Sequence, residues 1–209
     1  MHSKTITEAT MKKKILALIA AVLVIVCAGC TQDHDHDHDH EETTAQPVQT
    51  FNTAGTVSGN KYQNAFASIT FVKPAKWTFL EGEALQSLGG DSATAICDMA
   101  AVDGTTNSSV KLIFLNSITI AGKTLSAKEY CDQTIKAASS ENDLSTVTAE
   151  SEVTLCGNNY LKVVLETSDP NNPMTITHYV RAIDHYIVDI TTKTPVAIAA
   201  QTNFESMFS

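Results

Sequence analysis

The spacing of apolar residues changes along the chain, and each change predicts a new secondary-structure element. Segments with strand-like spacing are bounded by turn residues and lie at residues 61–70, 93–102, 147–155, 161–165, 174–181 and 185–192. A further segment, residues 110–115 (VKLIFL), is apolar toward both faces, which predicts a strand in the interior of the sheet. The last two segments in the first group are close enough in sequence to form a hairpin.

Three other segments predict helices. Residues 81–88 have helical spacing and end at two glycines, which commonly stop a helix. Ser126 and Glu129 have the spacing of a capping box, in which each side chain satisfies a backbone N–H of the other, and helical apolar spacing follows. Pro195 after a threonine predicts the start of a last helix that continues to Phe208.

The order of these elements predicts the fold class. It reads strand, helix, two strands, helix, four strands and helix, with short turns between neighbouring strands. Parallel sheets need regular alternation of strands and helices, and this chain lacks that alternation. We therefore expect residues 55–209 to form one α+β domain, with an antiparallel sheet and helices packed on it.

The N-terminal pattern differs from the rest of the chain. Lys12, Lys13 and Lys14 precede an uncharged apolar run at residues 15–29, which is the pattern of a secretory signal peptide. The run of 15 residues is shorter than the ~20 that a membrane-spanning helix needs. We expect residues 1–29 to be a signal peptide, with Met11 as an alternative start.

The apolar run ends in Cys27-Ala28-Gly29-Cys30. This segment resembles the bacterial lipobox, in which small residues precede a cysteine that is acylated and becomes the mature N-terminus. The resemblance implies a lipid anchor at Cys30 and a location on the extracytoplasmic face of the cell membrane. Cys27 departs from the lipobox pattern, which usually has an aliphatic residue there.

A strictly alternating acidic-histidine segment follows the cysteine. Its candidate metal ligands are Asp33, His34, Asp35, His36, Asp37, His38, Asp39 and His40. Imidazole suits Zn, Ni and Cu, and carboxylates add charge and oxygen ligands. The segment has no apolar residue to bury, so we expect residues 30–54 to be a disordered tether. It resembles the His/Asp-rich stretches of extracytoplasmic zinc-uptake lipoproteins; the alternative is a spacer without a metal role.

The folded part also resembles a known family. The opening Tyr62-Gln63-Asn64, residues 69–77 with their closing Pro74-Ala75-Lys76-Trp77, and the strand and helix at residues 186–208 resemble the PsbP-like α/β/α sandwich. That family also occurs in small lipoproteins of anaerobic Gram-positive bacteria. The resemblance implies a non-enzymatic binding or assembly module and assigns no functional residue.

Charge and composition exclude some functions. The net charge is −9, and residues 1–29 contribute +3, so the remaining chain carries −12. No Lys/Arg cluster offers a phosphate-binding surface, so we expect no nucleic-acid partner. We find no nucleophile elbow, zinc-protease motif, P-loop or dinucleotide fingerprint, and we therefore expect no enzymatic activity.

A few residues of the domain are candidates for further chemistry. His178 is in phase with apolar strand residues, which favours a hydrogen-bonded core position over a ligand role. His185 follows Asp184 at the predicted hairpin tip, and both histidines are weaker candidates as metal ligands. Cys131 is expected to be buried and Cys156 to be more exposed. One disulfide among Cys97, Cys131 and Cys156 is possible.

These patterns together predict a membrane-anchored extracytoplasmic lipoprotein. Its tether would bind Zn, Ni or Cu, its domain would be a binding platform, and a transporter or envelope protein would be its partner. The alternative is a cell-envelope interaction module in which the tether is only a spacer.

Overall fold

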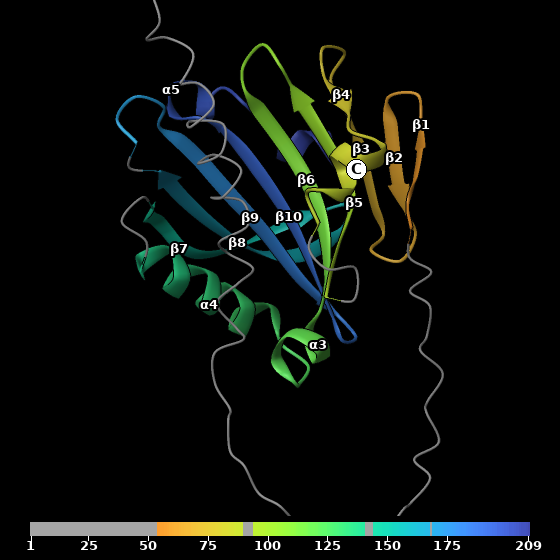
Figure 1. Ribbon diagram of the computed structural model, residues 1–209, viewed down its shortest axis with the longest axis vertical. Coiled ribbons are helices and arrows are strands. Elements are labelled where there is room, and N and C mark those ends of the chain that lie inside the picture. The colour runs from red at the N-terminus through yellow and green to blue at the C-terminus, as the bar shows by residue number, and fades with distance from the viewer. Residues whose placement is uncertain (1–53, 90–93, 141–143, 168) are drawn as a thin grey trace, which may run out of the picture.

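The computed structural model describes residues 54–89, 94–140, 144–167 and 169–209. Its strands form two antiparallel sheets, and Figure 1 shows the smaller one beside and behind the larger one. The strands are β1 (Thr56–Ser58), β2 (Lys61–Asn64), β3 (Ile69–Val72), β4 (Thr78–Phe79), β5 (Ala95–Asp103), β6 (Ser108–Asn116), β7 (Leu144–Leu155), β8 (Asn158–Thr167), β9 (Met174–Ile183) and β10 (Tyr186–Pro195). The helices are α2 (Gly82–Gln86), α3 (Ser117–Ala121), α4 (Ala127–Ser140), α5 (Val196–Ala199) and a 3-10 turn, η1 (Glu205–Met207).

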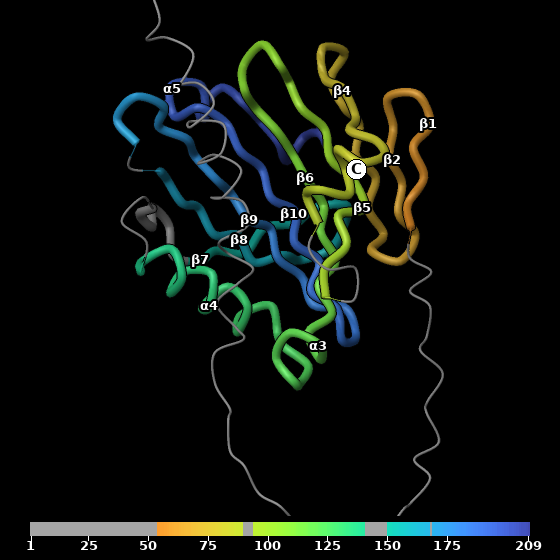
Figure 2. The backbone as a smooth tube through the Cα atoms, viewed as in Figure 1, coloured from red at the N-terminus to blue at the C-terminus, as the bar shows by residue number. Residues whose placement is uncertain are grey.

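The large sheet has the strand order β4-β5-β6-β10-β9-β8-β7, and the small sheet has the order β1-β2-β3. The α+β class with an antiparallel sheet is therefore confirmed, as are the interior position of β6 and the β9–β10 hairpin. Figure 2 shows the tip of this hairpin next to α3, where Ser117 N donates to the carbonyl of His185. None of the described helices is long and apolar enough to cross a bilayer.

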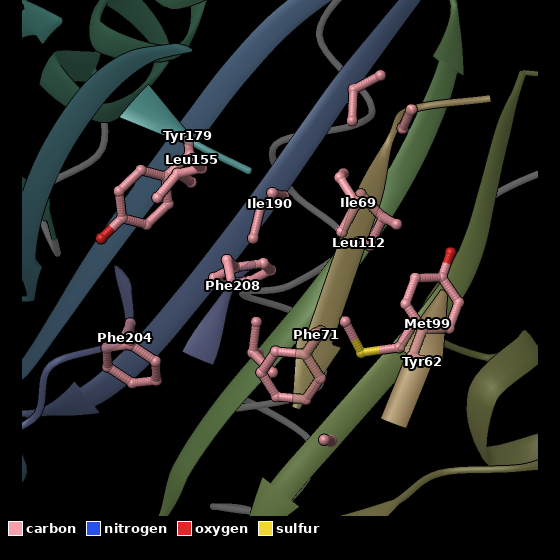
Figure 3. Close-up of a cluster of buried hydrophobic side chains, with 14 of the residues drawn as sticks. Tyr62, Ile69, Phe71, Met99, Leu112, Leu155, Tyr179, Ile190, Phe204 and Phe208 are labelled. Carbon is pink, nitrogen blue, oxygen red and sulfur yellow. The ribbon is translucent and has the colours of Figure 1, made fainter. Parts of the chain in front are cut away.

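The two faces of the large sheet bury two separate cores. We call the first the small-sheet core, because the inner faces of β2 and β3 cover it (Figure 3). Its members include aromatic and aliphatic side chains from both sheets and the chain end, among them Tyr62, Ile69, Phe71, Trp77, Met99, Leu112, Phe114, Tyr160, Tyr179, Ile190, Phe204 and Phe208. The second, the helix-side core, lies under α2 and α4 and contains Cys97, Ile113, Leu115, Cys131, Val163, Leu165, Val180 and Ile187.

A bulge in β5 lets this strand contribute to both cores. Cys97 pairs with Ile113 and Met99 pairs with the adjacent Leu112 of β6, so Asp98 has no partner on β6 and is the extra residue. Cys97 faces the helix-side core, whereas Met99 faces the small-sheet core. An inserted residue reverses the inward and outward alternation of a strand, which explains the switch.

Asp98 joins the two sheets. Its Oδ2 accepts hydrogen bonds from Gly55 N at 2.8 Å, from Asn64 Nδ2 at 2.9 Å and from the hydroxyl of Tyr62. Burial first, and the bond to Asp98 second, raise the pKa of Tyr62, so its hydroxyl stays a donor. A Cβ at Gly55 would collide with the Tyr62 ring, so only glycine lets the backbone approach this carboxylate.

Two expectations from the sequence were wrong. The strand predicted at residues 61–70 is two strands, because Asn64 Oδ1 accepts from Ala67 N and Ser68 adopts a left-handed φ of 53°. The helix predicted from Pro195 to Phe208 is a single helical turn, α5, followed by η1. Short isolated helices are marginal, and the chain end is instead held by Phe208, which pairs with Phe71 in an isolated bridge.

The hydrogen bonds that Asp98 accepts from Gly55, Tyr62 and Asn64 give the first testable prediction. Asp98→Ala should lower the free energy of unfolding by about 2–4 kcal/mol, because it leaves a buried hydroxyl and two N–H donors without their charged acceptor. Urea unfolding followed by tryptophan fluorescence would measure this, since Trp77 lies in the small-sheet core. The control Asp132→Ala removes an exposed carboxylate of α4 and should change stability by less than about 0.5 kcal/mol. Equal stabilities of the two variants would contradict the role given to Asp98.

Candidate functional site

A group of polar residues interrupts the helix-side core at the centre of the large sheet. Thr191 of β10 pairs with Lys111 of β6 on one side and with His178 of β9 on the other. Side chains alternate along a strand, so Asp189 and Lys193 lie on the same face as Thr191, one on each side of it. We call these five residues the Thr191 cluster.

The surroundings of this cluster are apolar. The row that pairs with Asp189 consists of Ile113 and Val180, and Val163 pairs with His178; all three are buried in the helix-side core. A charged group in such surroundings costs several kcal/mol unless it is paired and hydrogen-bonded. The partners of the charged members therefore decide what the cluster can do.

Asp189 is fully hydrogen-bonded. His178 Nδ1 lies 3.0 Å from Oδ2 and 3.2 Å from Oδ1, and the hydroxyl of Thr191 donates to Oδ1 at 3.2 Å. From α4, the hydroxyl of Tyr130 donates to Oδ2 at 3.0 Å. Both carboxylate oxygens are thus engaged by neighbours within the domain.

These contacts keep Asp189 ionised. Burial alone would raise the pKa of its carboxyl, but the charge and hydrogen bond of His178, followed by the charge of Lys111, outweigh burial and lower it. Burial first, and the neighbouring Asp189 second, raise the pKa of the Tyr130 hydroxyl well above its usual value. Tyr130 is therefore a permanent donor and Asp189 a permanent acceptor at neutral pH.

The carboxylate also sets the orientation of His178. Because Asp189 accepts at Nδ1, that nitrogen carries the proton in the neutral ring and Nε2 is left with a lone pair. Within the described ranges, no group hydrogen-bonds to Nε2. A buried carboxylate that fixes an imidazole and leaves its second nitrogen available is a common arrangement in binding and catalytic sites.

Lys111 and Lys193 supply the positive charge of the cluster. Both are half-buried, and they are diagonal neighbours across β6 and β10. Neither makes an ion pair with a carboxylate of the described residues, since the five ion pairs found there involve other side chains. Burial first, and the charge of Lys111 second, lower the pKa of Lys193. The two ammonium groups thus lack a counter-ion in direct contact.

The second histidine lies elsewhere. His185 is at the tip of the β9–β10 hairpin, where its ring packs 4.2 Å from that of Tyr186. His178 is seven residues earlier, which corresponds to about 23 Å of extended chain. The structure therefore does not bring the two histidines together, and the core position expected for His178 is confirmed at 7% exposure.

The other candidates from the sequence have different outcomes. Cys30 and the segment from Asp33 to His40 lie outside the described residues. Among the residues that the structure does describe, no group of three or more His, Cys, Asp or Glu side chains is placed to hold a metal ion. Cys97, Cys131 and Cys156 are free thiols; Cys131 is buried as expected, and Cys156 is half-buried.

A shallow depression of about 490 Å³ lies next to the first turn of α4. It is lined by residues from α4, β7, β8 and β9 and by the β7–β8 turn, among them Ala127, Glu152, Asn159, Leu161 and Ala182. No member of the Thr191 cluster lines it, so the depression and the cluster are separate features.

The sequence reasoning missed four of the five cluster residues. A signal was present in each strand: Lys111, Asp189 and Lys193 are charged residues inside runs that are otherwise apolar or β-branched. Each charged residue taken alone predicts a side chain that faces outward from the sheet. Only the strand register shows that they share one face with His178.

Comparison with known proteins gives structural likenesses only. No known protein-family profile matches the sequence, and no curated protein matches it. Among solved structures, the chain is similar to cyanobacterial PsbP (CyanoP) from Synechocystis sp. PCC 6803, with 14% identity, a TM-score of 0.48, and coverage of 78% of this chain and 99% of that one.

Two further likenesses are weaker. LpqN of Mycobacterium tuberculosis, described as involved in cell envelope biogenesis, is 10% identical with a TM-score of 0.45, over 68% of this chain and 82% of that one. The Ran-binding protein Mog1p of Saccharomyces cerevisiae is 12% identical with a TM-score of 0.41, over 70% and 84%. At this level of similarity, no residue role is transferred to this chain.

The buried pair gives the second prediction. Asp189→Asn should lower the free energy of unfolding at pH 7 by about 3 kcal/mol, because it removes the charge that pairs with His178. The folded-state pKa of Asp189 is below the unfolded value near 4, so its stabilisation is complete above pH 4 and is lost as the pH falls further. The difference between the two proteins should therefore be constant above pH 4 and should shrink as the pH falls from 4 to 2.

Urea unfolding over this pH range would measure the effect. Asp184→Asn is the matched control, because Asp184 is exposed at the hairpin tip and has a left-handed φ of 52° that asparagine tolerates. A constant difference between Asp189→Asn and the original protein down to pH 2 would mean that the charge of Asp189 is not what stabilises the fold.

Proposed function

We propose that this protein is an extracytoplasmic lipoprotein whose tether binds divalent transition metal and whose α+β domain is a binding platform. One observation carries the proposal, namely the order of features at residues 11–42. A lysine-rich start, an apolar run, a lipobox-like end at Cys30 and the Asp/His segment follow one another without a break. Each feature is expected next to the others if the segment is to bind ions close to a lipid surface.

The link between tether and domain limits how far the domain can move from the lipid. Gly55 is fixed by Asp98 and lies 25 positions after Cys30 in the sequence. A fully extended chain of this length spans at most about 85 Å. The Asp/His segment begins three residues after Cys30, so its ligands stay within about 45 Å of the membrane, where a transporter could receive the metal.

Charge supports a metal role more than contact with lipid head groups. Residues 33–42 hold four Asp and two Glu, a charge of −6 that attracts cations and is repelled by anionic lipids. The four interspersed histidines give nitrogen ligands that a purely acidic spacer would not have. If the segment were only a spacer, as in an envelope interaction module, its histidines would serve no purpose.

The metal role gives the third prediction. The chain from Thr31 keeps every described contact, since these lie within residues 54–209. Titration calorimetry with Zn, Ni and Cu should give micromolar or tighter binding, and deletion of residues 33–42 should abolish it. Binding that survives the deletion would place the site in the domain. No binding by either protein would leave an envelope interaction module with a spacer.

The anchor gives the fourth prediction. When the full chain is expressed in a bacterium with an alkyne fatty acid, it should be labelled and found in the membrane fraction. Cys30→Ala should lose the label and leave the membrane fraction. Cys27→Ala is the matched control, because it changes the neighbouring cysteine and keeps Cys30. Labelling of Cys30→Ala, or loss of the label in Cys27→Ala alone, would contradict acylation at Cys30.

A further inference from the structure

We propose that Lys111, Lys193 and His178 form a binding site for a small oxyanion, a carboxylate or phosphate group of a low-molecular-weight ligand. The proposal deepens the binding-platform part of the proposed function. It does not depend on metal binding by the tether, because every residue involved lies in the described domain.

The charge of the cluster is not balanced from within. Asp189 is its only carboxylate, and both of its oxygens are engaged by His178, Thr191 and Tyr130. Lys111 feels Asp189 at a distance, and neither lysine has a carboxylate of the described domain within 4.0 Å. Two half-buried ammonium groups with one distant counter-charge favour the arrival of an anion.

The geometry brings the donors to one place. Lys111 and His178 are on the two strands that flank β10, directly opposite Thr191. Adjacent strands are about 4.8 Å apart, so the side chains of Lys111 and His178 start about 10 Å apart. Lys193 is on the strand between them, two residues after Thr191. Side chains of this length can converge on a single group of two to four oxygens.

His178 adds a donor that responds to the ligand. In the neutral ring Nε2 carries a lone pair and is an acceptor, so it cannot hydrogen-bond to an oxyanion, which is also only an acceptor. A ring that carries a proton on both nitrogens donates from Nδ1 to Asp189 and from Nε2 to a ligand. Binding of an oxyanion is therefore expected to place a proton on Nε2.

Neighbouring elements restrict the size of the ligand. On one side, Tyr130 of α4 reaches the cluster at Asp189. On the other side, the chain just after α2 packs closely on β5, where a Cβ at Gly89 would lie 3.2 Å from the backbone nitrogen of Cys97. The lysines lie on the two strands between these elements, β6 and β10. The site thus suits a small anion, and the net charge of −9 disfavours a polyanion such as nucleic acid.

The test uses the chain from Thr31, labelled with ¹⁵N, and two probes: inorganic phosphate and succinate. Amide shifts are followed at constant ionic strength maintained with NaCl, so that a change in general electrostatic screening does not contribute to them. The expected result is saturable shifts centred on Lys111, His178, Thr191 and Lys193, with the side-chain ¹⁵N signal of His178 Nε2 moving to its protonated position. Preference for phosphate or for succinate identifies the ligand class.

Matched variants separate a site from general attraction. Lys111→Gln with Lys193→Gln keeps most of each stem and should weaken binding by at least about tenfold, because both charge-assisted donors are lost. Lys136→Gln removes an exposed lysine of α4 and should leave the affinity unchanged. The proposal is overturned if neither probe gives saturable shifts at the cluster, or if both variants bind like the original chain.

Discussion

The whole arrangement depends on one extra residue in β5. Without the bulge at Asp98, every second residue of β5 would face the same side of the sheet along the whole strand. Cys97 and Met99 would then face the same side, and one of them would leave its core. The bulge also turns the carboxylate of Asp98 toward the small sheet, where Tyr62 and Asn64 meet it. A single backbone irregularity therefore fills both cores and attaches the second layer.

The two faces of the large sheet are stabilised in different ways. The small-sheet core is rich in aromatic rings, with ring centroids 5.2 Å apart for Phe71 and Phe208 and 6.0 Å apart for Trp77 and Phe204. The helix-side core is aliphatic around a polar centre, the Thr191 cluster. Low polarity around that centre strengthens each of its hydrogen bonds and makes each missing partner costly. This contrast is why Lys111 and Lys193, which make no ion pair with the residues that the structure describes, point to a ligand, whereas the satisfied carboxylate of Asp189 does not.

Tether and domain make separate contributions to the proposed function. The tether offers imidazole and carboxylate ligands that suit cations, and the Thr191 cluster offers ammonium groups that suit anions. Asp98 connects the two parts, because it holds the backbone of Gly55 at the point where the tether enters β1. A lipoprotein built in this way would present two sites of opposite preference at a membrane surface.

The sequence by itself determined the features that depend on near neighbours in the chain. The capping box of Ser126 and Glu129 set the start of α4, and the short connection at Asp184 set the β9–β10 hairpin. It did not determine the bulge, the turn at Asn64 or the path of the last 14 residues, since packing across the sheets decides each of these. The Thr191 cluster also required the tertiary structure. Lys111 and His178 are 67 residues apart in the sequence, and only the pairing of β6, β10 and β9 places them on either side of Thr191. Local spacing shows which face of its own strand a residue occupies, but register between strands depends on the combined packing of the whole sheet.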